Sequence, residues 1–163
     1  MCSQARDGAV GVDFSKPPAQ AALLQQAGVL ARASTPGAPM AGKKLALLSP
    51  QPGDEAATEF IQAAQALGAH VSFVRAGLDD ASADAQVEAT SRLLGQLYDA
   101  VECQHLSTEL VRRVSRGAGV PVFEGLATAA HPTAALADAL QGEASPQVKR
   151  RCILQAALLL SMG

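Results

Sequence analysis

The sequence contains no tryptophan, and its aromatic residues make up only 3% of 163 residues. Proteins that bind nucleic acids use aromatic side chains to stack on bases and a surplus of positive charge to hold phosphates. Here 13 basic residues stand against 15 acidic ones, which leaves a net charge of −2. The composition therefore argues against a nucleic-acid-binding surface.

Cysteine is also scarce, since Cys2, Cys103 and Cys152 are odd in number and far apart. This usage is typical of reduced thiols in a cytosol rather than of a secreted disulfide framework. No two of the cysteines stand at metal-ligand spacing with a histidine. We therefore expect a cytoplasmic protein that needs no metal and no cofactor, with Cys103 and Cys152 buried and inert.

Long apolar runs are missing as well. No stretch reaches the roughly 18 unbroken apolar residues that cross a membrane. The nearest candidate, Val148–Met162, is interrupted by Lys149, Arg150 and Arg151. The first residues are polar and lack the apolar core of a signal peptide. We expect residues 1–18 to form a flexible arm and the protein to make no contact with membranes.

The chain instead alternates short β-like runs with amphipathic helical windows, after a first helical stripe at Ala19–Ala33. The runs are Leu45–Leu48, Val71–Val74, Ala100–Cys103 and Val120–Phe123, and the windows are Asp54–Leu67, Ala83–Leu97, Ser107–Ala118 and Pro132–Leu140. This order predicts an α/β three-layer sandwich with a four-stranded, mostly parallel sheet and helices on both faces. We expect residues 19–144 to form this domain, and 145–163, with a helix at Ser145–Ser161, to dock back on it.

The segment Ser49–Ala57 joins the first run to the helix that follows it. In an open α/β sheet this junction binds anions, because free N–H groups and the positive end of the helix dipole point there. An anion site would show glycines, hydroxyls or basic side chains, yet this helix opens with Asp54 and Glu55. Carboxylates in a first turn commonly just complement the helix dipole, so we interpret the segment as a well-capped helix start. The alternatives are that Asp54 and Glu55 bind a cation or repel a competing ligand.

Several motifs occur in a fixed order: Gly42–Leu48, Asp99-Ala100, Val120–Leu126 and His131-Pro132-Thr133. Together they resemble the aspartate/ornithine carbamoyltransferases in their carbamoyl-phosphate-binding N-terminal domain, with ornithine-type spacing. The third motif is similar to the family's Val-Pro-Val-Ile-Asn-Gly-Leu, and the fourth to its His-Pro-x-Gln segment. The resemblance covers Ala19 to Leu140 and implies the fold described above.

The resemblance also places the family's Ser-Thr-Arg-Thr-Arg phosphate loop on Gly53, Asp54, Glu55, Ala56 and Ala57, where neither arginine and no hydroxyl remains. In the family these groups hold carbamoyl phosphate, a dianion suited to guanidinium forks. A carboxylate about 4 Å from a phosphate costs roughly 4 kcal/mol per unit charge pair at an effective dielectric near 20. The resemblance therefore implies a degenerate substrate loop.

The remaining ligand positions point the same way. The family's arginine after the third strand falls on Gln104, beside His105, and its Asp-Thr pair becomes Ala89-Thr90. Only His131 persists, which by resemblance would hydrogen-bond the carbamoyl carbonyl. His131 is either this remnant or a histidine held locally at a helix start. Gln104 and His105 either line a small polar pocket or lie in a solvated loop.

Two functions follow from the resemblance. The first is a catalytically inactive, carbamoyltransferase-related protein that acts in assembly or regulation, as a homotrimer or with an intact carbamoyltransferase. The family's second, amino-acid-binding domain is not found in this chain. The alternative is a small-molecule-binding carboxyl- or carbamoyltransferase with an altered donor site built from Thr90, Gln104, His105 and His131. That alternative needs cationic groups, which only a partner chain could supply.

Two basic clusters remain, Arg112/Arg113/Arg116 and Lys149/Arg150/Arg151. Runs of this length are usually solvated helix faces. If the two helices adjoin, they form an anion or partner patch instead.

Overall fold

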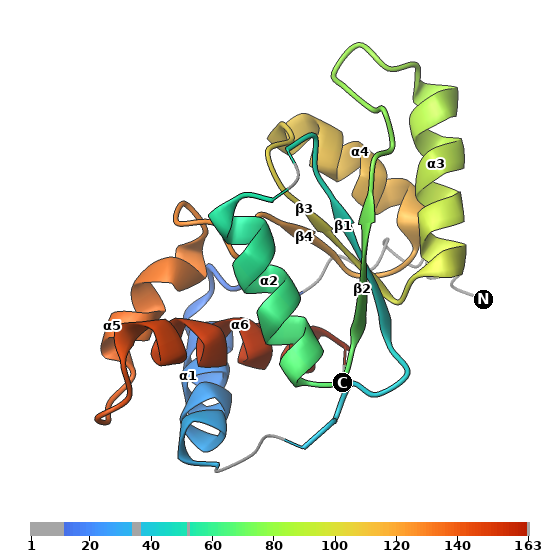
Figure 1. Ribbon diagram of the computed structural model, residues 1–163. Helices are drawn as coiled ribbons and strands as arrows, with labels where there is room; N and C mark the ends of the chain where they lie inside the picture. Colours follow the sequence, from blue (N-terminus) through green and yellow to red (C-terminus); the bar gives the residue numbers. More distant parts are fainter. Residues whose placement is uncertain (1–11, 34–36, 52, 163) are drawn as a thin grey trace, which may run out of the picture.

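The computed structural model describes residues 12–33, 37–51 and 53–162 (Figure 1). Its elements are α1 (Pro17–Arg32), β1 (Lys44–Leu48), α2 (Glu55–Ala66), β2 (His70–Val74), α3 (Asp84–Leu97), β3 (Ala100–Cys103), α4 (Thr108–Ala118), β4 (Val122–Glu124), the 3-10 helix η1 (Pro132–Ala135), α5 (Leu136–Ala139) and α6 (Pro146–Met162). Every predicted run and window is confirmed to within two residues at each end. The window Pro132–Leu140 differs in kind, because it begins as a 3-10 turn.

The four strands form one sheet in the order β2-β1-β3-β4, and all three pairings are parallel. The chain steps from β1 outward to β2 and then crosses back to β3 on the other side of β1. The switch point of the sheet therefore lies between β1 and β3, where the loops that follow these strands diverge. Crevices at such points are the usual ligand sites of open α/β sheets.

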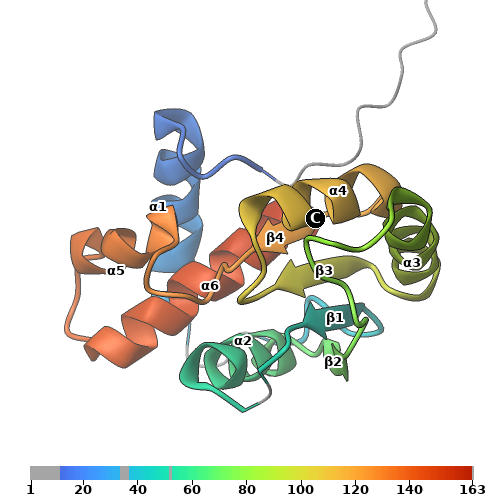
Figure 2. The ribbon, with the colours of Figure 1, turned by 90° about the horizontal axis from the view of Figure 1, so that it is seen from above.

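Two apolar cores lie on opposite faces of the sheet, because successive side chains of a strand alternate in direction. Leu45 and Leu47 of β1 belong to the core under α1, α2, α5 and α6, whereas Ala46 and Leu48 belong to the core under α3 and α4. Figure 2 shows α2 and α4 on either side of the sheet. The predicted three-layer sandwich is confirmed.

The last helix, α6, packs against α1, α2 and α5. Its buried residues are Cys152, Ile153, Leu154, Gln155, Ala156, Ala157 and Leu158. Gln155 donates from Nε2 to the carbonyl oxygen of Ala63 on α2, at 3.2 Å. The expected docking of a terminal helix is therefore both apolar and polar.

The segment expected as a flexible arm, 1–18, differs in its described part. Phe14 is buried in the core. Helix α1 begins at Pro17, because the first turn of a helix tolerates prolines, which have no N–H group to be satisfied. Residues 1–11, with Cys2, lie outside the described residues. Cys103 and Cys152 are free and buried, as expected. None of the described helices is long and apolar enough to cross a membrane.

Candidate functional site

The loop from β1 to α2 ends in a helix cap. Gly53 takes a positive φ of 82° and turns the chain into α2. Asp54 then acts as N-cap, with its Oδ1 accepting from the N–H of Ala57 at 2.8 Å. This bond satisfies one of the donors that a helix leaves free at its start. The interpretation of this loop as a capped helix start fits the geometry.

His105 lies opposite Asp54 at the switch point. Its backbone φ of 57° is positive, which is rare for a residue other than glycine. Its Nε2 hydrogen-bonds to Oδ2 of Asp54, and the two side chains are 35% and 30% exposed. The N–H of Ala57, and then the bond to His105, hold the pKa of Asp54 below its ordinary value. Asp54 is therefore ionised at neutral pH and lies at the positive end of α2.

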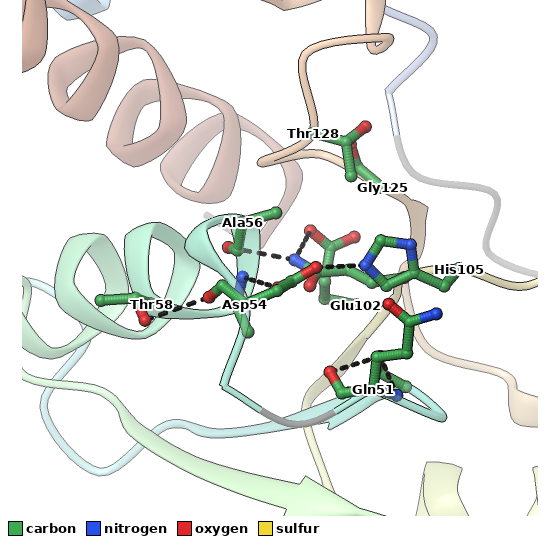
Figure 3. A network of polar contacts seen from close by, with 11 residues as sticks. Gln51, Asp54, Ala56, Thr58, Glu102, His105, Gly125 and Thr128 are labelled. Atoms are coloured by element: carbon green, nitrogen blue, oxygen red, sulfur yellow. Dashed lines mark hydrogen bonds and ion pairs between the residues drawn. The ribbon is translucent and has the colours of Figure 1, made fainter.

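Gln104 is fully buried, which rules out a solvated loop at this position. Its Nε2 donates to the carbonyl oxygen of Ala56 at 3.2 Å and lies 3.4 Å from Oε2 of Glu102 (Figure 3). The amide thus connects β3 to the first turn of α2. The place that would hold an arginine by resemblance is filled by a neutral group turned inward.

Glu102 is the functional candidate that the sequence analysis missed. It has no exposed surface. Its two carboxylate oxygens accept from the N–H groups of Leu126 and Ala127, at 3.0 and 3.2 Å. Burial raises the pKa of this carboxyl to about 7, against the lowering effect of these bonds. The signal was a charged residue inside the otherwise apolar run Ala100–Cys103.

His131 is held at the start of η1, where its Nδ1 accepts from the N–H of Thr133 at 3.2 Å. Burial, and then the nearby charge of Arg150, lower the pKa of the ring to about 4. The imidazole is therefore neutral at pH 7, and its proton lies on Nε2. The local hydrogen bond is the one expected for a histidine held at a helix start.

A cavity of about 470 Å³ lies at the carboxyl ends of β3 and β4, and its lining residues are Cys103, His105, Leu106, Glu124, Gly125, Thr128, Ala130, His131 and Pro132. The fold thus brings His105 and His131 to one cavity, whose described lining residues include no arginine or lysine. Arg112 and Arg116 line a second cavity of about 450 Å³ that shares Glu124 and His131 with the first, so the expectation that only a partner chain could supply cationic groups is wrong. Thr90 lies on α3 and lines none of the cavities around these residues. The described residues contain no cluster suited to a metal ion.

The two basic clusters do not combine into one patch. α4 and α6 belong to the cores on opposite faces of the sheet. Arg113 pairs with Asp84 at 2.7 Å. Arg150 turns inward and donates to the carbonyl oxygens of Leu126 and Thr128 at 3.1 and 3.2 Å. Both arginines act within the fold, and because the two helices do not adjoin, the condition for a shared anion patch is not met.

Residues 12–143 match the family model described as aspartate/ornithine carbamoyltransferase, carbamoyl-P binding domain. The chain belongs to the aspartate/ornithine carbamoyltransferase family. The match covers the whole sheet. The β1–α2 loop and the cavity lined by His105 and His131 therefore both lie within the matched domain.

Individual proteins that are similar to this carbamoyltransferase-family chain support the same family assignment. It is 35% identical to an ornithine carbamoyltransferase of Actinobacillus pleuropneumoniae over 99 residues, which are 61% of the chain and 30% of the relative. The crystal structure of ornithine carbamoyltransferase from Thermus thermophilus matches with a TM-score of 0.64 at 30% identity, covering 78% of this chain and 45% of that one. The enzyme from Pyrococcus furiosus shares the fold, with a TM-score of 0.67 at 24% identity over 82% and 44% of the two chains. The chain thus spans about a third to a half of these relatives.

Proposed function

We propose that this chain is a catalytically inactive, carbamoyltransferase-related protein that acts through assembly, as a homotrimer or with an intact carbamoyltransferase. One observation carries the proposal. The carboxylate of Asp54 caps α2 and pairs with His105 at the place where, by resemblance, the family binds a phosphate. The first turn that would receive the substrate anion therefore already holds an anion of its own.

The electrostatics of the cavity support this proposal. Its described lining contains the carboxylate of Glu124 and two histidines but no guanidinium or ammonium group, whereas Arg112 and Arg116 line the separate cavity that shares His131. Glu55, in the first turn of α2, adds another exposed carboxylate. Repulsion of roughly 4 kcal/mol per charge pair at 4 Å exceeds the 1.5–3 kcal/mol that a hydrogen bond to a charged group typically contributes. A phosphorylated donor is therefore disfavoured here.

An assembly role is supported by apolar side chains at the surface. Leu93 and Leu97 stand four residues apart on α3 and are 53% and 55% exposed. Residues at this spacing share one helix face. We propose this α3 face as part of the assembly surface. A cytoplasmic location, which suits the free and buried thiols, belongs to the same proposal.

A second candidate is a small-molecule site with an altered donor. His131 favours it, because its neutral ring carries the proton on Nε2 and lines the cavity of about 470 Å³. Such an N–H donor suits the carbonyl oxygen of a carboxyl or carbamoyl group.

Thermal denaturation with excess carbamoyl phosphate distinguishes the two candidates. Saturating binding raises the midpoint by several degrees through linkage. We expect no rise for this chain, while an intact ornithine carbamoyltransferase, as the positive control, shows one. A rise that disappears in His131→Ala would overturn the inactive assignment in favour of the second candidate.

Assembly is tested by size-exclusion chromatography with light scattering, for the chain alone and mixed with an intact ornithine carbamoyltransferase. We expect a trimer or a mixed complex, which the double variant Leu93→Glu/Leu97→Glu weakens. The matched control is Val29→Glu/Val148→Glu, which also adds two charges at exposed apolar positions of helices. A chain that stays monomeric in both experiments contradicts the assembly role.

A further inference from the structure

Glu102 is a buried carboxyl group that only neutral donors hold. Its Oε1 accepts from Leu126 N at 3.0 Å, and its Oε2 accepts from Ala127 N at 3.2 Å and faces Nε2 of Gln104 at 3.4 Å. Among the described residues no basic side chain hydrogen-bonds to it. Figure 3 shows this carboxyl between the start of α2 and the loop that carries Gly125 and Thr128. A carboxylate so placed gains no salt bridge to offset the loss of its hydration.

The neighbouring Gln104 has a complementary defect. Its Nε2 donates to the carbonyl oxygen of Ala56, but its Oε1 is buried and has no hydrogen-bond partner. An unsatisfied buried acceptor is costly and calls for an explanation. When Glu102 is ionised, its carboxylate has no hydrogen to give. When Glu102 is protonated, its O–H becomes a donor beside the same amide, whose Oε1 is the acceptor that has no partner.

Charged and titratable groups lie around Glu102, and its protonated and ionised forms are close in free energy near neutral pH. Arg150 of α6 is the cation whose charge it meets, and Glu59 of α2 shares that arginine. Of the titratable groups on the remaining elements, Cys103 of β3 senses the charge of Glu102, and Glu124 of β4 acts on Cys103 and His131. Burial raises the pKa of the Cys103 thiol, so that it stays uncharged.

We propose that Glu102 is a proton-operated clamp on the segment Gly125–His131, which sets the wall of the cavity at the carboxyl ends of β3 and β4. In the ionised form the carboxylate holds the N–H groups of Leu126 and Ala127 with both oxygens. In the protonated form one oxygen turns its hydrogen toward Gln104, and the hold on Ala127 weakens. Thr128, Ala130 and His131 line the cavity. Protonation of Glu102 therefore alters the shape of the cavity by loosening this segment.

Arg150 fixes the same segment from the other side, through the carbonyl oxygens of Leu126 and Thr128. Loss of the carboxylate therefore leaves the segment attached to α6 while its attachment to β3 loosens. The movement is confined to the cavity wall, and the sheet stays intact. This clamp works whether or not the chain assembles with itself or with an intact carbamoyltransferase, so the inference goes beyond the proposed function.

A pH titration of the amide resonances of the full chain by ¹H–¹⁵N NMR tests the clamp. We expect the amides of Leu126 and Ala127 to titrate together between pH 5.5 and 8.5 with a midpoint of about 7. In Glu102→Gln both titrations should disappear. In the control Glu124→Gln, which removes an exposed carboxyl from β4, they should persist. Amides that do not shift, or that shift equally in Glu102→Gln, overturn the proposal.

The wild-type chain provides a second measurement, which needs no variant to fold. With ¹³C-labelled glutamate carboxyls, one resonance should titrate with a midpoint of about 7, well above the ordinary value of 4.5. Protection of the Ala127 amide from hydrogen exchange should fall by about tenfold as this group gains its proton, because one charge-assisted bond is weakened. If every glutamate titrates below pH 5.5, the clamp does not exist.

Discussion

The carboxylate of Asp54 and the imidazole of His105 form a hydrogen bond across 51 positions of the sequence. The other oxygen of Asp54 caps α2 through the N–H of Ala57. One side chain therefore stabilises the helix start and ties the loop after β1 to the loop after β3. This contact spans the switch point of the sheet, which is the usual ligand crevice of such folds. In this chain the contact between Asp54 and His105 spans that crevice.

We expect Asp54→Ala to lower the free energy of unfolding by about 1 kcal/mol, because it removes the N-cap bond. Glu55→Ala is the control, since this exposed carboxylate only complements the helix dipole, and it should cost less than about 0.5 kcal/mol. Urea denaturation at pH 7 measures both. Because the pKa of Asp54 is held below 3.8 in the folded chain, its contribution is present above that pH and is lost as the pH falls further. Equal effects of the two variants would contradict the capping role.

Local patterns predicted most of this fold. Alternating apolar runs and windows indicated each element, and Ser107 and Gly119 mark the two ends of α4 with a cap and a left-handed turn. The pairing of Asp54 with His105 could not be predicted in the same way, because it depends on where two loops meet in space. Glu102 was missed for a related reason. Its partners are backbone N–H groups of a loop more than twenty residues away, which leave no mark in side-chain sequence.

Arg150 joins α6 to the segment after β4 and should be a major contributor to stability. Its guanidinium donates to the carbonyl oxygens of Leu126 and Thr128. Arg150→Met keeps much of the apolar stem but leaves these acceptors unpaired, at a cost of about 2 kcal/mol. Arg151→Met is the matched control, because Arg151 is exposed and reaches only Gln62, at 3.4 Å. We expect that control to change the free energy of unfolding by less than about 0.5 kcal/mol. Similar losses in both variants would show that α6 is held by its apolar face alone.

The crossing of α3 and α4 requires a glycine at position 95. A Cβ added there would lie 1.7 Å from the carbonyl oxygen of Ala118, which is backbone and cannot rotate away. Gly95→Ala should therefore cost about 3 kcal/mol by forcing the helices apart. At Gly28 of α1 the nearest atoms would be 3.8 Å away in the flexible side chain of Arg32. Gly28→Ala should instead stabilise the fold by about 0.5–1 kcal/mol, since alanine favours a helix. Chemical denaturation of the pair checks both signs.

The pH dependence of stability should contain two opposing contributions. The folded pKa of Glu102, about 7, lies above its ordinary value of 4.5, so the folded chain binds this proton more tightly than the unfolded chain. Its contribution is full below pH 4.5 and is lost as the pH rises to about 7, by up to about 3 kcal/mol. His131 behaves in the opposite sense. Its folded pKa of about 4 lies below the ordinary value of 6.5, so the unfolded chain binds this proton more tightly. The contribution of His131 to stability is therefore full above pH 6.5 and is lost as the pH falls toward 4.

Single variants separate these contributions between pH 4.5 and 6.5. In Glu102→Gln only the histidine contribution remains, and the free energy of unfolding should rise with pH. In His131→Asn, which keeps an acceptor for the N–H of Thr133, only the Glu102 contribution remains, and the free energy should fall with pH. The wild-type profile should lie between them and be nearly flat, because the two protons offset each other. Urea denaturation at half-unit pH steps measures all three slopes, and a Glu102→Gln profile parallel to wild type would show that this carboxyl is already ionised throughout the range.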